Sequence, residues 1–358
     1  MEEIQIKSLH EFQRYYYTNL KRELLLLEKK RKEVVQKMYG VGIVLGLAVV
    51  LVFFIIQIFH LKFSLVILAL CGCGAVWSFM YSRNSADYVR EFKTRILQEI
   101  INFIDKNLNY TSVNYIPSST FYESQIFPRH PDRYQGDDYV SGIIGKTEIA
   151  FSEIHAEYQE EKSNSPSSNF DVYSALLGIA ERLMRGQPIR LSNLGEDVFS
   201  NRRWYTIFKG LFFVADFNKS FSCQTLVLPE SANGVFTQLK ALLPSWNKRG
   251  ERIKLEDPEF NKLFVVYSND QVESRYILST SLMARLAQFK KKADKKIYIS
   301  FVNTKIYVAI AYSKDLFEPK VFKTMAEFTP MKEYFEDLEL ALSIVHDLNL
   351  NTRIWSKQ

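Results

Sequence analysis

Three alternating residues, Glu153, His155 and Glu157, come closest to a metal-binding pattern. Alternate side chains of a strand point to one face, so this carboxylate–imidazole–carboxylate row could hold a divalent ion if a fourth ligand came from elsewhere. The five histidines are otherwise scattered along the chain. A solvated strand face is the simpler interpretation. We therefore expect no metal and no cofactor, and keep these three residues as the metal candidates.

The segment Ser141–Thr147 reads SGIIGKT and approaches a phosphate-binding loop. Such a loop requires glycine where Val140 stands, and a helix behind it. The following residues instead favour a strand, so we predict a turn rather than a nucleotide site. The sequence contains no Gly-x-Ser-x-Gly motif, and Cys223 has no histidine near it in the chain. No catalytic residues are identified.

Two uncharged runs, residues 39–59 and 63–81, determine the class of protein. A helix needs about 20 mostly apolar residues to cross the hydrocarbon core of a bilayer, and both runs are long enough. Only His60, Leu61 and Lys62 separate them. Because this connection is so short, the two spans must be adjacent and antiparallel. The sequence predicts a transmembrane helical hairpin over residues 39–82.

Basic residues predict how the hairpin is oriented. Seven Lys and Arg residues lie in positions 21–37 before the first run, four lie in positions 83–95 after the second, and Lys62 stands alone between them. The positive-inside rule therefore predicts two spans with both termini in the cytoplasm. Of the net charge of +6, five charges lie before residue 116. The nearly neutral remainder predicts no nucleic-acid partner. Cys71 and Cys73 lie in the second run and Cys223 stands alone, which implies no disulfide framework.

Small residues in the two runs favour close helix packing. Gly42 and Gly46 form a GxxxG pair, and Gly72 and Gly74 lie in a Cys-Gly-Cys-Gly stretch. The packing could be within the hairpin or between protomers.

Helical periodicity flanks the two runs. Apolar residues at spacings of three and four predict an amphipathic helix over 1–38 and a juxtamembrane helix over 83–115. Since a tight hairpin returns these segments side by side, we expect a two-helix coiled stalk. An oligomeric stalk is the open alternative.

Residues 116–358 mix strand and helix signals without a βαβ rhythm, which predicts an antiparallel-rich α+β domain in the cytosol. Residues 116–137 read as a linker or as extended surface packing, and 160–169 as a flexible loop. The predicted strands are 147–158, 210–217, 222–228, 263–267, 296–302 and 305–312. The predicted helices are 172–185, 234–243, 281–292 and 330–348, the last with Thr329 as N-cap, and a short helix opens at Asp257-Pro258.

A run of five lysines is the strongest basic feature of this domain. It lies at the end of the predicted helix 281–292, where the helix dipole favours cations. The alternative role is contact with anionic lipid headgroups, because the domain is expected beside the cytoplasmic leaflet. The five residues are Lys290, Lys291, Lys292, Lys295 and Lys296.

Several stretches resemble a bacterial membrane-protein family with a domain of unknown function, number 3137, sometimes labelled "galanin". They are GKTEIAFSEIHAEY (Gly145–Tyr158), FKGLFFVADFNKSF (Phe208–Phe221), KLEDPEFNKLFVVYSNDQVESRYILSTSLM (Lys254–Met283), LFEP (Leu316–Pro319) and the terminal LNLNTRIW. Gln271 departs from the family, which often has proline there. The resemblance implies a basic helical N-terminus, two spans and a cytoplasmic domain, with no reaction or catalytic residues to carry over.

These features predict an accessory or scaffold protein of the bacterial inner membrane, whose cytosolic module binds a partner. The expected partners are the lipid bilayer and either another protein or a second copy, through the spans and the stalk. One alternative is a membrane-acting effector or sensor in stress or phage defence. The other is an enzyme with a dispersed metal or hydrolase site near His155.

Overall fold

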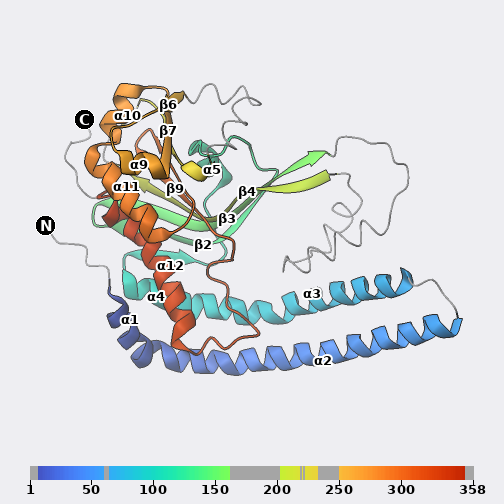
Figure 1. The fold of residues 1–358 in the computed structure, drawn as a ribbon. Helices are drawn as coiled ribbons and strands as arrows, with labels where there is room; N and C mark the ends of the chain where they lie inside the picture. Colours follow the sequence, from blue (N-terminus) through green and yellow to red (C-terminus); the bar gives the residue numbers. More distant parts are fainter. Residues whose placement is uncertain are drawn as a thin grey trace.

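The computed structural model describes residues 7–59, 64–161, 202–217, 220, 222–232 and 250–350. The described residues begin with a continuous helical path. It consists of α1 (Leu9–Tyr15), a π-helical turn η1 (Tyr16–Leu20) and α2 (Lys21–Phe59) (Figure 1). A reciprocal cap sets its start. Ser8 Oγ accepts from the Glu11 N–H at 3.3 Å, and the Glu11 carboxylate accepts from the Ser8 N–H at 2.7 Å.

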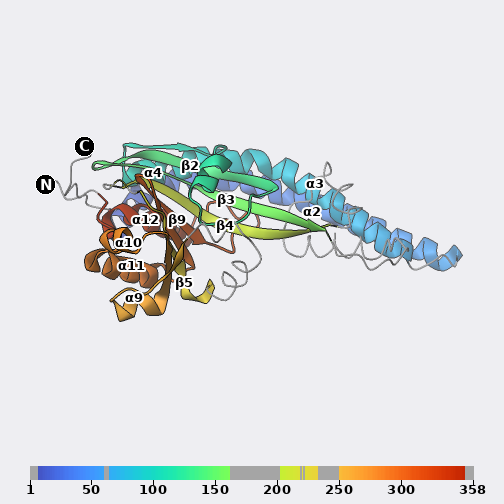
Figure 2. The same cartoon turned by 90° about the horizontal axis from the view of Figure 1, so that it is seen from above.

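A second helical path lies beside the first. It consists of α3 (Ser64–Phe92), a π-helical turn η2 (Lys93–Leu97) and α4 (Gln98–Ile104), and α3 lies alongside α2 in both views (Figures 1 and 2). Within the described residues, one helix is long and apolar enough to cross a membrane, Leu9–Phe59, and its most apolar stretch is almost entirely exposed.

The predicted juxtamembrane helix over 83–115 is too long. The helix ends at Ile104, and Leu108–Thr111 forms strand β1. Backbone pairing of Leu108 with Gly142 draws this segment into the sheet. The sheet domain therefore begins before residue 116.

A nine-stranded, fully antiparallel sheet forms the centre of the described domain, in the order β1-β2-β3-β4-β9-β8-β5-β7-β6. All six predicted strands are present, so the α+β class with an antiparallel sheet is confirmed. After β1, the strands are β2 (Arg133–Ile144), β3 (Thr147–Glu161), β4 (Arg202–Asp216), β5 (Thr225–Pro229), β6 (Glu251–Ile253), β7 (Phe264–Ser268), β8 (Ile297–Val302) and β9 (Lys305–Ala311).

Two tight turns order the sheet. The turn predicted in Ser141–Thr147 is confirmed. Gly145 takes a φ of +63° between Ile144 and Thr147, which pair across β2 and β3. Asn303 takes a φ of +56° in the β8–β9 turn. The interpretation of 116–137 as a linker is wrong at residues 118–123, which form a helix. It is also wrong from residue 133 onward, since the polar start of β2 pairs with β3.

Helices cover one face of the sheet (Figure 2). They are α9 (Pro258–Leu263), α10 (Gln271–Ile277), α11 (Thr280–Ala293) and α12 (Phe328–Asp347), while the short α5 (Ser118–Glu123) covers the other face. Asp257 caps α9, as predicted. The N-cap of α12 is Glu327 rather than Thr329, because the chain is still extended at Glu327 and helical after it.

The base of the two helical paths belongs to the main core of the domain. Phe12 is fully buried and stacks on Phe335 of α12, with ring centroids 4.4 Å apart. The Tyr16 hydroxyl donates to the Ala326 carbonyl at 2.6 Å. The expected stalk is therefore not a separate coiled coil at this end, because its apolar stripe packs on α12.

Some predictions fall outside the described residues. Of the loop predicted over 160–169, Glu160 and Glu161 instead end β3, and the remainder lies outside. The predicted helices 172–185 and 234–243 also lie there.

Candidate functional site: a buried charged cluster

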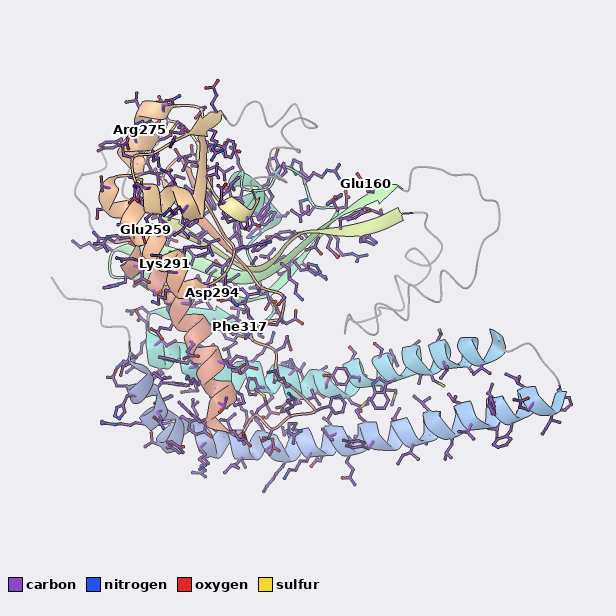
Figure 3. The ribbon with its side chains drawn as sticks, in the orientation of Figure 1. Glu160, Glu259, Arg275, Lys291, Asp294 and Phe317 are labelled. Carbon is purple, nitrogen blue, oxygen red and sulfur yellow. The ribbon has the colours of Figure 1, made fainter. Side chains whose placement is uncertain are left out.

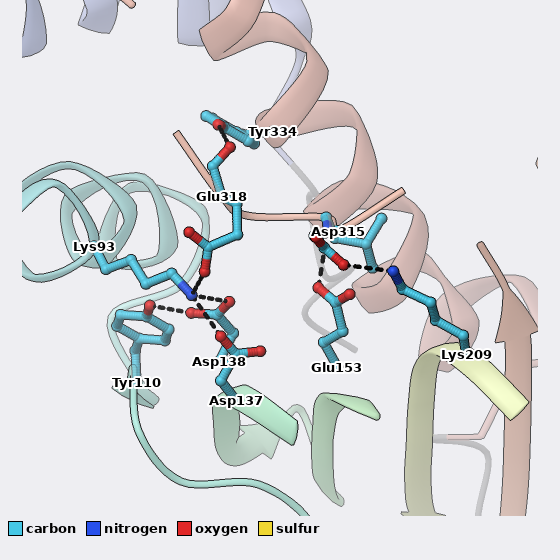
Figure 4. A network of polar contacts seen from close by, with 10 residues as sticks. Lys93, Tyr110, Asp137, Asp138, Glu153, Lys209, Asp315, Glu318 and Tyr334 are labelled. Atoms are coloured by element: carbon cyan, nitrogen blue, oxygen red, sulfur yellow. Dashed lines mark hydrogen bonds and ion pairs between the residues drawn. The ribbon is translucent and has the colours of Figure 1, made fainter. Parts of the chain in front are cut away.

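Lys93, the first residue of η2, is buried among carboxylates where the second helical path meets the sheet (Figure 4). Its Nζ lies 2.6 Å from Asp137 Oδ2, 2.8 Å from Asp138 Oδ2 and 2.6 Å from Glu318 Oε1. Ion pairs at this depth depend on such tight geometry, because burial removes both partners from water. We refer to Lys93, Asp137, Asp138, Glu153 and Glu318 as the charged cluster.

A β-bulge brings the two neighbouring aspartates to the same ammonium. The β2–β3 register shifts between Asp137 and Val140, and Asp138 takes a φ of +55°. Neighbouring residues of a regular strand point to opposite faces, and a bulge is the usual device for re-aiming one of them. The Tyr110 hydroxyl of β1 donates to Asp138 Oδ1 and holds that carboxylate in place.

The connection between β9 and α12, residues 312–327, supplies the other wall of the cluster. Glu318 pairs with Lys93, and its carbonyl accepts from the Tyr334 hydroxyl at 2.8 Å. The Leu316 N–H donates to Glu153 Oε2 at 2.8 Å (Figure 4). Asp315 Oδ1 lies 2.7 Å from Lys209 Nζ on β4.

The same connection also crosses the helices. Arg31 of α2, itself paired with Glu28, donates to the Val321 carbonyl at 2.7 Å. Tyr81 of α3 stacks on Phe322 with ring centroids 5.7 Å apart. Residues 312–327 therefore tie α2, α3 and the sheet to one another through hydrogen bonds and ion pairs.

The cluster contains more acid than base. Burial alone would lower the pKa of Lys93, but Asp138, Glu318 and Asp137 raise it well above its ordinary value. Burial, together with the charge on Asp137, raises the pKa of Asp138 to about 7. Burial likewise raises the pKa of Glu153 to about 8, although the Leu316 N–H acts in the opposite direction. The cluster therefore retains protons near neutral pH.

Asp137, Asp138 and Glu153 could in principle hold a hard cation. One carboxylate oxygen from each lies within 4.8 Å of the others, and oxygen ligands of this kind suit Ca²⁺ or Mg²⁺. Lys93 already occupies the cationic position beside the two aspartates. A metal ion would have to displace that ammonium, so we interpret the cluster as an internal ion-pair network.

The three metal candidates, Glu153, His155 and Glu157, lie in two different environments. Glu153 belongs to the charged cluster, whereas His155 Nε2 lies 3.5 Å from Glu157 Oε1. Arg133 Nη1 lies 3.3 Å from the other oxygen of Glu157. Burial lowers the pKa of His155, which is still partly exposed. The interpretation of the row as a solvated face is wrong at Glu153 and Glu157, because both side chains are buried.

Three of the five lysines in the basic run have protein partners. Lys291 pairs with Glu259 (Figure 3), Lys292 Nζ lies 3.1 Å from Asp347 Oδ2, and Lys295 lies over the Tyr312 ring. Helix α11, which leads into this run, is at the end of the molecule opposite the free ends of α2 and α3 (Figures 1 and 2). Lipid contact by these lysines stays a prediction.

The packing glycines differ in their surroundings. A Cβ on Gly42 would come within 2.9 Å of the Trp77 ring of α3, so this glycine permits close contact within the helix pair. A Cβ on Gly46 or Gly72 would meet nothing within 4 Å. Packing by those two glycines against a second copy stays a prediction.

Sequence reasoning missed Lys93, Asp137, Asp138 and Glu318 as a group. Each is an ordinary charged residue in its local sequence, and only the fold brings them together. One signal was available: Asp137 and Glu153 become direct cross-strand neighbours once the Gly145 turn fixes the β2–β3 register.

The chain combines a long exposed apolar helix, a second helical path whose Lys93 is ion-paired to the sheet, and nine antiparallel strands. These features define an α+β protein with a membrane-compatible N-terminal helix. Residues 206–350 match the model of the family described as "Protein of unknown function (DUF3137)", the family that the sequence resembles. This match confirms the resemblance. No curated protein and no solved structure matches the chain.

Proposed function

We propose that the chain is a membrane-anchored accessory or scaffold protein, whose α+β domain binds a partner at the cytoplasmic face of the bacterial inner membrane. In this proposal α2 and α3 cross the bilayer as a two-span hairpin, and both termini are cytoplasmic. The proposal covers anchoring and presentation of a binding domain, without a reaction.

The observation that carries the proposal is the exposure of large apolar side chains along α2. Ile43, Leu47 and Phe59 are 65%, 66% and 68% exposed. A continuous apolar surface of this kind is costly in water and is the normal outer surface of a membrane helix. On α3, Leu70, Val76 and Phe79 are also exposed, which favours a second span.

The charged cluster supports the second half of the proposal. Lys93 follows α3 directly, twelve residues after the second uncharged run, and is fixed to β2 and to Glu318 by three ion pairs. Arg31 fixes the helix before the first span to Val321. The domain would therefore be held at a defined position against the membrane, which suits a scaffold better than a flexible tether.

Cysteine accessibility tests the topology. Cys71, Cys73 and Cys223 are first replaced by serine, and single cysteines are introduced at Ser8, Lys62 or Lys106. In intact cells, a membrane-impermeant maleimide should label only Lys62→Cys, and all three should react after lysis. Recovery of the wild-type chain in the soluble fraction, or labelling of Ser8→Cys in intact cells, would contradict the anchor or its orientation.

Partner binding is tested with the full chain in detergent. Crosslinking before extraction, followed by affinity purification, should recover a specific protein with the wild type. The matched control is the α2–α3 hairpin alone, residues 21–92, tagged in the same way. If the wild type and the hairpin alone recovered the same proteins in equal amounts, the result would contradict a binding role for the α+β domain. The effector and enzyme alternatives have no comparable support among the described residues.

A further inference from the structure

An open groove of about 490 Å³ runs between α2 and α3. This volume is within the range of about 300–1,000 Å³ that is typical of small-molecule sites. Val44, Leu45, Val76 and Met80 supply most of its wall, and the polar members are Lys37 and Asn84. The groove is separate from the charged cluster, and no residue of the cluster lines it.

The groove is polar at one end and apolar at the other. Contact between Gly42 and Trp77 fixes the register of the two helices, which run in opposite directions. On this register Lys37 is level with Ser82, within two residues of Asn84, and Leu45 is level with Gly74, within two residues of Val76. At 1.5 Å per residue, the stretch of α2 from Lys37 to Leu45 is about 12 Å long. In the proposed topology, the polar end lies at the cytoplasmic headgroup level and the apolar end lies within the bilayer.

The polar end carries cations that the protein does not neutralise. Lys37 is exposed and has no ion-pair partner within the described residues, and the same holds for Arg83, which precedes Asn84. Lys30 and Arg31, farther from the groove, are paired with Glu91 and Glu28. No acidic residue lines the groove. An anion is the missing complement.

We propose that this groove binds one anionic phospholipid. The acyl chain lies along Val44, Leu45, Val76 and Met80, and the headgroup phosphate lies between Lys37 and Arg83. This inference rests on the proposed membrane location of α2 and α3. A helix from a second copy is the competing occupant. It fits less well because the first apolar run, residues 39–59, has no charge and would leave Lys37 and Arg83 without an anion.

Native mass spectrometry of the full chain tests the site. The wild type is reconstituted in vesicles of equal phosphatidylglycerol and phosphatidylethanolamine, extracted in mild detergent and examined for retained lipid. We expect one retained phospholipid per chain, enriched in phosphatidylglycerol. Val44→Trp should fill the groove and abolish retention. Leu47→Trp is the matched control, since Val44 and Leu47 are equally exposed at 65% and 66% but Leu47 does not line the groove.

The charge requirement is tested separately. Lys37→Ala should reduce the preference for phosphatidylglycerol about fivefold, in line with the usual contribution of one cation near an anionic headgroup. Lys29→Ala, an exposed lysine two turns before the groove, should leave it unchanged.

The outcomes separate this inference from the proposed function. If Leu47→Trp reduced lipid retention as much as Val44→Trp, the retained lipid would be nonspecific and the site would be overturned. Retention without any headgroup preference would overturn the site as well. A lipid-free dimer would assign the groove to a second copy. In both cases the chain is still membrane-embedded. If the chain were absent from the membrane fraction, the proposed function itself would be contradicted.

Discussion

Lys93 Nζ lies 2.6 Å from Glu318 Oε1, and this contact joins the helix that follows α3 to the connection that leads into α12. The same ammonium contacts Asp137 and Asp138 on β2. One side chain thus holds together three segments that are distant in sequence. Its removal leaves the buried Asp138 carboxylate without a cation, next to the partly exposed Asp137 and Glu318, which is more costly than the loss of an exposed ion pair.

Lys93→Met should therefore destabilise the chain by about 3–5 kcal/mol at neutral pH. The methionine fills similar space but leaves Asp138 without its cation. Lys106→Met, at an exposed lysine close by in the chain, should change stability by less than about 0.5 kcal/mol. Thermal unfolding of both variants in the same detergent measures the difference. Combining Lys93→Met with Asp138→Asn should restore part of the loss. If the double variant were less stable than Lys93→Met alone, repulsion among the carboxylates would not be the cause.

The charged cluster should make the fold less stable as the pH rises. Burial raises the pKa of Glu153 from an ordinary value near 4.5 to about 8, so the folded chain holds this proton more tightly than the unfolded chain does. Between about pH 4.5 and 8 the folded state binds more protons, and its stability falls as pH increases through that window. Each pKa unit corresponds to about 1.4 kcal/mol.

Glu153→Gln tests this dependence, because glutamine imitates the neutral acid. Its amide oxygen can still accept from the Leu316 N–H. The melting temperature of the wild type should fall between pH 5 and pH 8, and the variant should show a shallower slope. Glu148→Gln, at an exposed carboxylate on the same strand, is the control. Parallel slopes in all three proteins would exclude Glu153 as the source.

Phe12 should contribute strongly to stability although it is close to the N-terminus. The ring is fully buried and stacks on Phe335, and truncation of a buried phenylalanine costs about 3–5 kcal/mol. Phe12→Ala should lower the melting temperature markedly, whereas Tyr17→Ala, at a side chain that is 54% exposed, should have little effect. Limited proteolysis should then cut the N-terminal helix of Phe12→Ala first. Equal resistance in both variants would contradict docking of α1 on α12.

Gly42→Leu and Gly46→Leu separate the two packing interpretations of the glycines. At Gly42 the new side chain meets Trp77, so the variant should push α2 and α3 apart and shift the tryptophan fluorescence. At Gly46 it meets open space within one chain. Gly46→Leu should leave the fluorescence unchanged. If the chain self-associates through Gly46, this variant should also lower the molecular mass measured by light scattering. A fluorescence shift of similar size in both variants would rule out the distinction.

The sequence predicted elements whose cause is local. The β8–β9 hairpin follows from alternating apolar residues around Asn303-Thr304, and α9 follows from Asp257 as a cap before Pro258. The start of β2 was missed because its polar residues are stabilised by pairing with β3 rather than by their own pattern. The charged cluster was missed for the same reason. Its members acquire a common role only through a bulge at Asp138 and a connection that returns from the far end of the chain.

Contact between the first and last described helices has a consequence for biosynthesis. Phe12 leaves the ribosome 323 residues ahead of Phe335, its stacking partner. If the apolar runs enter the bilayer as they emerge, α1 must wait beside the membrane with its apolar stripe uncovered until α12 has been synthesised. A nascent chain cut short before α12 would keep that stripe exposed, and a quality-control protease or chaperone could recognise unfinished copies by it.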